Sequence, residues 1–336
     1  MALGYAAINY KLQQSGTFTN RTCRKKTLQS KGLEYISGLA FQNCLDLREL
    51  VKWNRAMGIK LFRVSSGLFP WMDEYDFRVL KDYKLIAITL KSVGEMATKY
   101  NQRLTFHPGP FNCLASPNEA VVAKTVRELD KHSEQFNMMG FEPSNYNKIN
   151  IHVGGTYNDK EATLERFCKN FELLADHTKK RLVVENDDKA SEYSVKDLYE
   201  GVYKRIGIPI TFDYYHHTFN TGGLTEEEAL KLAATTWPTG IKQCCHYSES
   251  RRKEQLFELR KACKQQNIIL EDINEDSLLY DMKREINKIK EIAHSDYVYK
   301  EINTYGLDVD IVVEAKMKEQ AVLNKIKKLS YEQKHI

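Results

Sequence analysis

Long apolar runs and paired cysteines are both missing from this sequence of 336 residues. No segment reaches the ~18 consecutive apolar residues that a membrane span needs, so we expect no membrane partner. The first residues, MALGYAAINYKL, contain no basic stretch followed by an apolar one, so we expect no signal peptide. The seven cysteines are odd in number and form no CxxC motif, which is typical of reduced thiols inside a cell. These absences predict a soluble intracellular protein of the cytoplasm or nucleus that is not secreted.

Phosphate-binding glycine loops, repeats and linkers are also missing. No GxGxxG or GxxxxGKS/T motif follows an apolar run, which disfavours the nucleotide-binding forms of open α/β sheets. No repeat, low-complexity tract or Gly/Ser linker divides the chain, so we expect a single domain over residues 1–330. The formal charge of +5 comes from 50 basic and 45 acidic residues, and this mild excess suits a nucleic-acid partner without requiring one.

Eight short apolar runs alternate with longer amphipathic segments along the chain. The runs lie near residues 3–9, 60–66, 102–107, 148–154, 181–186, 208–213, 241–247 and 309–314. Helix-like segments between them start with 43–57, and several later ones open with capping residues or acidic first turns, as at Thr225. Eight such units predict an α/β protein of the (β/α)8 TIM-barrel type. An open doubly wound sheet is the alternative architecture.

One connection is longer than a barrel requires. About 60 residues separate the seventh and eighth apolar runs, where a strand–helix–strand unit needs about 30. We expect residues 250–292 to form a charged helical insertion between strands 7 and 8, on the rim of the catalytic face. The insertion is either a solvated decoration or a flap that contacts the substrate, because SRRKEQ and KREINKIK offer cations.

Metal-ligand side chains stand at or just after the ends of six of the apolar runs. A parallel strand is buried on both faces, so a His or carboxylate at its C-terminal end is costly unless it is paired or binds a cation. In a barrel these strand ends converge on one face, so the pattern predicts a shared metal site. The candidate ligands are His107, His152, Glu185, Asp213, His216, His246 and Glu314.

The ligand types and their number narrow the kind of site. Mixed His and carboxylate ligands suit zinc, manganese or iron better than calcium or magnesium. The set exceeds the three or four protein ligands of one ion, so we expect two or three ions, with Glu185 as the bridge between two of them. Single residues have other interpretations: a strand-end His can be an ordinary satisfied polar residue, Glu185 can belong to an acidic loop, and Asp213 can cap the next helix.

Sequence segments in a fixed order also resemble a known family. They are LGYAAIN, FRVSSGLFPW, FHPGP, NIHVGG, VVEND, FDYYHH, HYSESR, AHSDY and IVVEAKMKE, spread over about residues 3–323. Together they resemble the UV damage endonucleases, (β/α)8-barrel DNA repair enzymes related to endonuclease IV and to the xylose-isomerase-like superfamily. The resemblance implies a metal-dependent endonuclease that nicks the phosphodiester immediately 5′ to a UV photoproduct, leaving a 3′-hydroxyl and a 5′-phosphate. The implied partner is UV-damaged double-stranded DNA, and we expect a monomer.

The resemblance implies roles for individual residues. It makes ligands of all seven candidates above and adds His294 of AHSDY, which with His216 resembles the holder of a third ion. Glu185, His246 and Glu314 are the implied catalytic residues. We expect two to three divalent ions, with Mn²⁺ as the first choice and Zn²⁺ or Mg²⁺ as alternatives.

Further positions are implied to contact DNA, and some depart from the family pattern. The implied contacts to DNA or the lesion are Tyr5, Asn9, Pro110 and Phe111. Lys316 is basic and close to Glu314 in sequence, so it either contacts a DNA phosphate or begins the last helix. Pro110 stands where the family usually has a Gln, so polar contact with the bases is absent there, whereas Phe111 can still stack on an unstacked base. Cys244 stands where the family often has a lysine near the metals, which puts the role of that lysine in doubt.

Three other functions remain as alternatives. An abasic-site endonuclease of the endonuclease IV type is the nearest enzyme, and a xylose-isomerase-like sugar isomerase or epimerase shares the barrel. The third is an inactive metal-bearing DNA-binding module, for which Cys244 and Pro110 are the only support.

Overall fold

Eight parallel strands form the centre of the computed structural model, which describes residues 1–332. The strands are β1 (Leu3–Ala6), β2 (Leu61–Val64), β3 (Arg103–Phe106), β4 (Ile149–Ile151), β5 (Leu182–Glu185), β6 (Ile210–Thr211), β7 (Cys244–Tyr247) and β8 (Asp310–Val313). They pair in the order β6-β5-β4-β3-β2-β1-β8-β7. A parallel bridge between Asp213 and His246 joins the two ends, and the His246 amide donates to the Phe212 carbonyl at 2.9 Å. The predicted (β/α)8 barrel is therefore confirmed.

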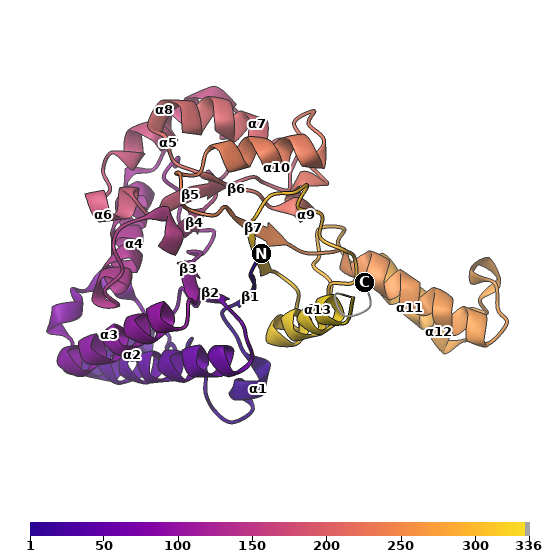
Figure 1. The fold of residues 1–336 in the computed structure, drawn as a ribbon, viewed down its shortest axis with the longest axis horizontal. Helices are drawn as coiled ribbons and strands as arrows, with labels where there is room; N and C mark the ends of the chain where they lie inside the picture. Colours follow the sequence, from indigo (N-terminus) through magenta and orange to yellow (C-terminus); the bar gives the residue numbers. More distant parts are fainter. Residues whose placement is uncertain (333–336) are drawn as a thin grey trace.

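Helices surround the strands on the outside (Figure 1). The α-helices are α1 (Tyr10–Gln13), α2 (Lys25–Ala56), α3 (Tyr83–Lys99), α4 (Glu119–Met138), α5 (Lys160–Phe171), α6 (Asp176–Lys179), α7 (Val195–Leu198), α8 (Lys204–Ile206), α9 (Tyr214–His217), α10 (Glu226–Thr235), α11 (Arg251–Gln265), α12 (Leu278–Asn287) and α13 (Lys318–Glu332). Short 3-10 turns cover Met72–Glu74, Phe77–Val79, Asn145–Asn147 and Leu270–Asp272, and a π-turn covers Tyr199–Tyr203. Within residues 1–332, no helix combines the length and apolar character needed to cross a membrane.

Side-chain alternation along the strands separates the barrel interior from the layer under the helices. Val183, Cys244 and Val312 pack in one small buried cluster, and each stands two residues before a predicted site residue on the same strand face. Gly4 approaches β2 so closely that a Cβ atom there would lie 2.2 Å from the Leu61 carbonyl oxygen, so only glycine fits.

The N-terminal end of the barrel is closed by an ion pair. Arg103 is buried, and its Nη1 lies 3.1 Å from Asp310 Oδ2 and donates to the Lys242 carbonyl at 2.9 Å. A buried guanidinium is stable only when acceptors such as these satisfy its N–H groups. The candidate metal ligands lie at the opposite end of the barrel, where the strands have their C-termini.

The first long helix begins earlier than its sequence pattern predicts. The sequence predicted a helix from Asn43, but α2 starts at Lys25 and is interrupted at Gly32, whose φ of 67° and ψ of −170° are not helical. Its buried residues begin only at Ile36, so the N-terminal part carries little of the apolar periodicity that marks a helix against a core.

The long connection after β7 forms a pair of helices that extends away from the barrel (Figure 1). α11 and α12 lie side by side and share a small apolar core of their own, made of Leu259, Cys263, Ile273, Leu279 and Ile286. The pair leaves β7 at Ser250 and returns at His294, where these two residues form an antiparallel bridge. The insertion therefore begins and ends on the rim of the strand-end face.

Candidate metal centre

The buried carboxylate of Glu185 lies at the centre of a ring of histidines. Its Oε2 is 3.2 Å from His107 Nε2 and 3.7 Å from His152 Nε2. Its Oε1 is 3.0 Å from His246 Nδ1 and 3.6 Å from His216 Nδ1. Four side chains, two that directly follow β3 and β4 and two from β7 and α9, thus converge on one carboxylate at the end of β5, as the strand-end pattern predicted.

These side chains divide into two sets that share Glu185. One set is His107, Glu185 and His246, and the other is His152, Glu185 and His216; within each set the nearest ligand atoms lie within 4.8 Å of one another. Each set has imidazole and carboxylate donors converging on one point, the arrangement that a divalent transition metal prefers. The geometry can hold a metal ion in each set, with Glu185 between them.

Glu314 and His294 extend the ring at the open side of the barrel. Glu314 Oε1 is 3.3 Å from His246 Nδ1, and Glu314 Oε2 is 3.6 Å from His294 Nδ1. His294 Nδ1 also lies 2.9 Å from the Glu314 carbonyl oxygen, which fixes the imidazole beside the carboxylate. Arg63 forms an ion pair with Glu314. The structure therefore brings His294, some 50 residues beyond His246, back to the same centre.

The two carboxylate oxygens of Asp213 lie in different environments. Oδ1 accepts hydrogen bonds from the amides of Tyr215 at 2.7 Å and His216 at 2.8 Å, so it caps α9. Oδ2 is buried and has no hydrogen-bond partner among the described residues. An unpartnered buried carboxylate oxygen is costly unless a cation or proton reaches it. The helix cap anticipated as an alternative is present, and it leaves one oxygen available as a ligand.

Burial and mutual charge shift the pKa values of the ring in opposite directions. Burial lowers the pKa of His246 to about 4 and also lowers that of His107. Burial opposes the charged form of His152 too, but Glu185 and Asp187 outweigh it and raise its pKa to about 10. For Glu185 itself, burial favours the neutral acid, yet the surrounding histidines hold its pKa well below the usual value. Glu185 is therefore an anion at neutral pH, which a bridging ligand must be.

Three polar residues of the site were not singled out from the sequence. Asn150 donates a hydrogen bond to Glu185 Oε2, and Lys148 and Arg63 also point toward the ring. Lys148, Asn150 and His152 alternate along β4 and its end, so all three face the barrel axis. Polar residues at every second position of a strand that should be apolar were the sequence signal from which Lys148 and Asn150 could have been predicted.

Asp187 is a fourth such residue, and it contacts a candidate ligand. Its Oδ1 lies 2.8 Å from His152 Nδ1, while His152 Nε2 faces Glu185. A carboxylate on one ring nitrogen keeps the proton there and leaves the lone pair of the other nitrogen for a metal. The sequence placed Asp187 only in an acidic run after Glu185.

The residues expected to contact a lesion are found in two different environments. Phe111 is 89% exposed in a turn four residues beyond His107, and Pro110 beside it is exposed as well. Tyr5 and Asn9 are buried, the Tyr5 hydroxyl donates to Asn54 of α2 at 2.8 Å, and Asn9 donates to that hydroxyl at 2.8 Å. Tyr5 faces the helices because it alternates with the inward Gly4. The structure thus leaves Phe111 free to meet a base but does not present Tyr5 or Asn9 to one.

Comparison with known proteins identifies the family of this chain. A family model described as UV-endonuclease UvdE matches residues 1–335. The chain belongs to this family. The resemblance drawn from the sequence motifs is therefore confirmed.

Several UvdE-type proteins are similar along most of the chain. The UV-damage endonuclease of Schizosaccharomyces pombe is 38% identical over 331 residues, a match that covers 95% of this chain and 49% of that protein. The chain thus spans about half the length of that relative. The UV DNA damage endonuclease of Bacillus pumilus is 29% identical over 310 residues, a match that covers 91% of this chain and 86% of that protein. The solved structure of SacUVDE superimposes with a TM-score of 0.76 at 28% identity, and the match covers 99% of each chain.

In this UvdE-family chain a buried lysine reaches the centre from an unexpected strand. Cys244 stands where the family resemblance implies a lysine. It is buried in the barrel interior, two residues before His246 on β7. Lys148 of the β4 segment instead donates to the Cys244 carbonyl at 2.9 Å and to Thr211 Oγ1 at 2.8 Å, and its Nζ lies 3.3 Å from His246 Nε2. The amine therefore comes from the β4 segment, which β5 and β6 separate from β7 around the barrel.

Proposed function

We propose that this protein is a metal-dependent DNA repair endonuclease that nicks the phosphodiester immediately 5′ to a UV photoproduct, leaving a 3′-hydroxyl and a 5′-phosphate. The observation that carries the proposal is the pair of ligand sets joined through Glu185, in a chain of the UvdE family. Two adjacent metal positions at one carboxylate are the standard device for phosphodiester hydrolysis.

The donor set fits two to three divalent ions, for which Mn²⁺ is our first choice and Zn²⁺ or Mg²⁺ the alternatives. His107 and His246 would serve one ion and His152 and His216 the second, with Glu185 shared. Glu314, His294 and the free Oδ2 of Asp213 are available to complete these positions or a third. When bound, such ions supply a hydroxide nucleophile at neutral pH and neutralise charge on the phosphate.

The chain's own residues would position the DNA. Lys316, two residues beyond Glu314, is exposed and would contact a backbone phosphate beside the centre. Phe111 would stack on a base or wedge into the helix where a photoproduct has already weakened stacking, since extrusion costs less there than at normal bases. Tyr5 and Asn9, the other two residues implied at the lesion edge, are buried and bonded to each other and to Asn54, so they would not contact a base directly.

Nicking of supercoiled plasmid tests the proposal. UV-irradiated, abasic and intact plasmids are incubated with the protein and Mn²⁺, and the nick is typed by extension of its 3′-hydroxyl with a DNA polymerase. We expect nicking of the irradiated plasmid and its loss in Glu185→Gln, which keeps the shape of the side chain but removes the bridging charge. Asp188→Asn, three residues away, is the matched control and should keep wild-type activity.

Three outcomes would contradict the proposal. Nicking restricted to the abasic plasmid would favour the endonuclease IV-like alternative. No nicking with Mn²⁺, Zn²⁺ or Mg²⁺ would favour the binding module or a sugar-converting enzyme, and near-normal nicking by Glu185→Gln would remove the metal-site assignment.

A further inference from the structure

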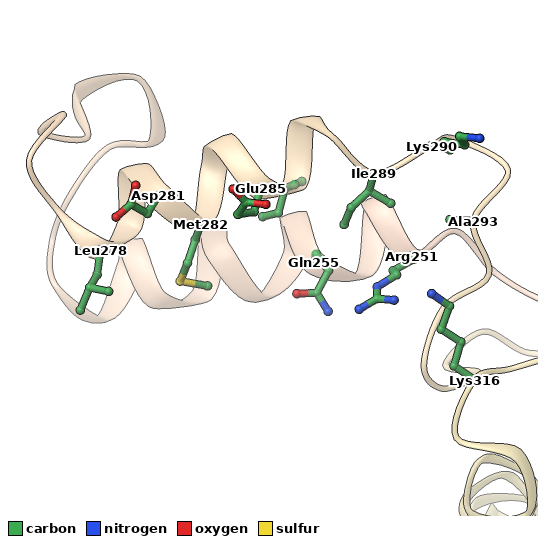
Figure 2. A pocket seen from close by; sticks show the side chains of 11 residues that line it. Arg251, Gln255, Leu278, Asp281, Met282, Glu285, Ile289, Lys290, Ala293 and Lys316 are labelled. Atoms are coloured by element: carbon green, nitrogen blue, oxygen red, sulfur yellow. The ribbon is translucent and has the colours of Figure 1, made fainter.

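A groove of about 630 Å³ runs along the inserted helix pair (Figure 2). Arg251 and Gln255 of α11 line one wall, and residues of α12 line the other. Near the barrel, the groove is lined by Lys290, Ala293 and Lys316. Ala293 directly precedes His294, and Lys316 follows Glu314 by two residues, so this end of the groove is lined by the segments that carry two residues of the ring.

The barrel end of the groove is rich in cations that have no counterion. Among residues 1–332, none of the side chains of Arg251, Lys290 and Lys316 forms an ion pair. The two acids on the groove wall are already paired, Asp281 with Arg284 at 3.2 Å and Glu285 with Lys288 at 2.6 Å. Figure 2 shows the three cations at the barrel end of the helix pair, whereas Leu278, Asp281 and Met282 lie toward its tip. The groove therefore presents its net positive charge next to the metal centre.

The side chain of Arg251 also has a nitrogen that lacks a hydrogen-bond acceptor. Its Nε is buried and has no hydrogen-bond partner within the described part of the chain. A buried guanidinium nitrogen without an acceptor is unfavourable, and the planar fork of Arg matches the oxygens of a phosphate. In Figure 2 the amine of Lys316 points toward Arg251 across the end of the groove. An anionic group placed between them would be held from both sides.

The backbone fixes these cations to the catalytic face. The Arg251 amide donates to the Ala293 carbonyl at 2.8 Å, and the Lys316 amide donates to the Ser295 carbonyl at 2.9 Å. The Ser295 amide donates to the Glu249 carbonyl at 2.7 Å. Both ends of the insertion are thus bonded to the segments that carry His294 and Glu314. The helix pair is held at a defined place relative to the ligands.

We infer that Arg251 and Lys290, together with Lys316, form a phosphate-binding track for the DNA strand that leaves the metal centre, so that the α11–α12 pair lies along the duplex beside the lesion. This inference rests on the proposed function and adds the insertion to the DNA-binding surface. α11 is 15 residues long and so spans about 22 Å, or roughly six phosphate spacings of one strand. Phosphate contacts carry no sequence information, so the track would serve damaged and intact flanks alike.

The test is equilibrium binding of the full-length protein to a fluorescent duplex, with and without one photoproduct, over a series of salt concentrations. It is done in the Glu185→Gln background, in which the proposed function predicts no cleavage. We expect Arg251→Ala/Lys290→Ala to weaken binding at least about tenfold on both duplexes. The slope of log affinity against log salt should fall by about 0.9 for each phosphate that the variant no longer neutralises.

A matched control on the same helix separates binding by the groove cations from a general effect of positive charge on α11. Arg260→Ala/Lys264→Ala removes two exposed cations of α11 that do not line the groove, and we expect less than a twofold change in affinity. The charge-preserving variant Arg251→Lys/Lys290→Arg should keep most of the affinity and the salt slope. It also covers the case in which the alanine variant does not fold.

The proposal is overturned if the alanine variant binds both duplexes as the parent does, or if the control variant loses as much. It is also overturned if the alanine variant keeps its DNA affinity but loses self-association in sedimentation, because a second copy of the chain would then occupy the groove. Failure of the nicking assay would be a separate result, since the binding measurement on intact duplex does not depend on cleavage.

Discussion

The neighbours of Glu185 keep its carboxylate ionised. Burial alone would favour the neutral acid, but four imidazoles within 3.0–3.7 Å and the amide of Asn150 stabilise the anion. The histidines in turn cannot all be cations in so small a volume, and the pKa of His246 falls to about 4 while that of His152 rises to about 10. The site thus combines one buried anion with two neutral imidazoles, those of His107 and His246, a donor set suited to divalent metal ions.

Asp187 gives a prediction at the residue scale. Its Oδ1 lies 2.8 Å from His152 Nδ1 and favours a proton on that nitrogen, so Nε2 is the nitrogen that would lose its proton to bind a metal. Asp187→Ala should therefore lower the affinity for Mn²⁺ by about 10- to 100-fold, the usual cost of removing such a partner. The measurement is the activation of plasmid nicking by Mn²⁺ after chelator treatment, together with metal content per chain.

The neighbouring carboxylate supplies the control for this prediction. Asp188→Ala removes the same functional group one residue away, at a half-buried position, and should leave the metal titration unchanged. Equal metal affinity in Asp187→Ala and the parent protein would show that His152 does not need this carboxylate.

At the scale of elements, the site is built from short strand ends and the residues just after them. His107, His152 and Glu314 follow the last residues of β3, β4 and β8, and Glu185 and His246 belong to β5 and β7. His216 comes instead from α9, whose N-terminus is capped by Asp213. One carboxylate thus sets the direction of the helix that carries a ligand.

The α11–α12 pair has a separate stability that can be measured. Leu259 is fully buried in the small core that the two helices share, apart from the main core of the barrel. Leu259→Ala should cost about 2–5 kcal/mol within this pair, enough to open it locally. We expect faster proteolysis between residues 252 and 290, with little change in the melting temperature of the barrel.

The matching substitution in the barrel should behave in the opposite way. Leu104 of β3 is equally buried but belongs to the main core. Leu104→Ala should lower the melting temperature by several degrees, about 4 °C for a loss of about 3 kcal/mol in a chain of this length, without selective cleavage of the insertion. A common fall in melting temperature for both variants would mean that the pair and the barrel unfold as one unit.

For the whole molecule, we expect metal binding to stabilise the closed barrel. The ligands come from strands distributed around the barrel, so the ion-binding geometry exists only in the folded state. At a Mn²⁺ concentration about 100 times the dissociation constant, binding should add about 2.7 kcal/mol to stability. With an unfolding entropy of about 0.7 kcal/mol/K for this length, the melting temperature should rise by about 4 °C.

Chelator-treated protein with and without added Mn²⁺ tests this linkage by thermal unfolding. Glu185→Gln should lose most of the stabilisation, and Asp188→Asn should retain it. An equal rise in all three proteins would place the stabilising ion away from the strand-end residues.

Much of the barrel and most of the ring could be predicted from sequence. Eight apolar runs gave the strands, and ligand side chains at the same end of successive strands predicted that they would meet, because parallel strands in a barrel share one face. The lesion-edge residues were harder to place, because a motif specifies the position of Tyr5 along β1 but its burial depends on which face of the strand packs against α2.

The sequence by itself determined the fold class, the ligand types and the family, since these depend on residue identity and on periodicity along the chain. Only the tertiary structure decided which candidate ligands share a carboxylate, that Lys148 rather than a β7 residue brings an amine to His246, and that Arg251, Lys290 and Lys316 line one groove. Those contacts join segments far apart in the sequence, and their distances follow from how strands close and helices pack, which no local pattern encodes.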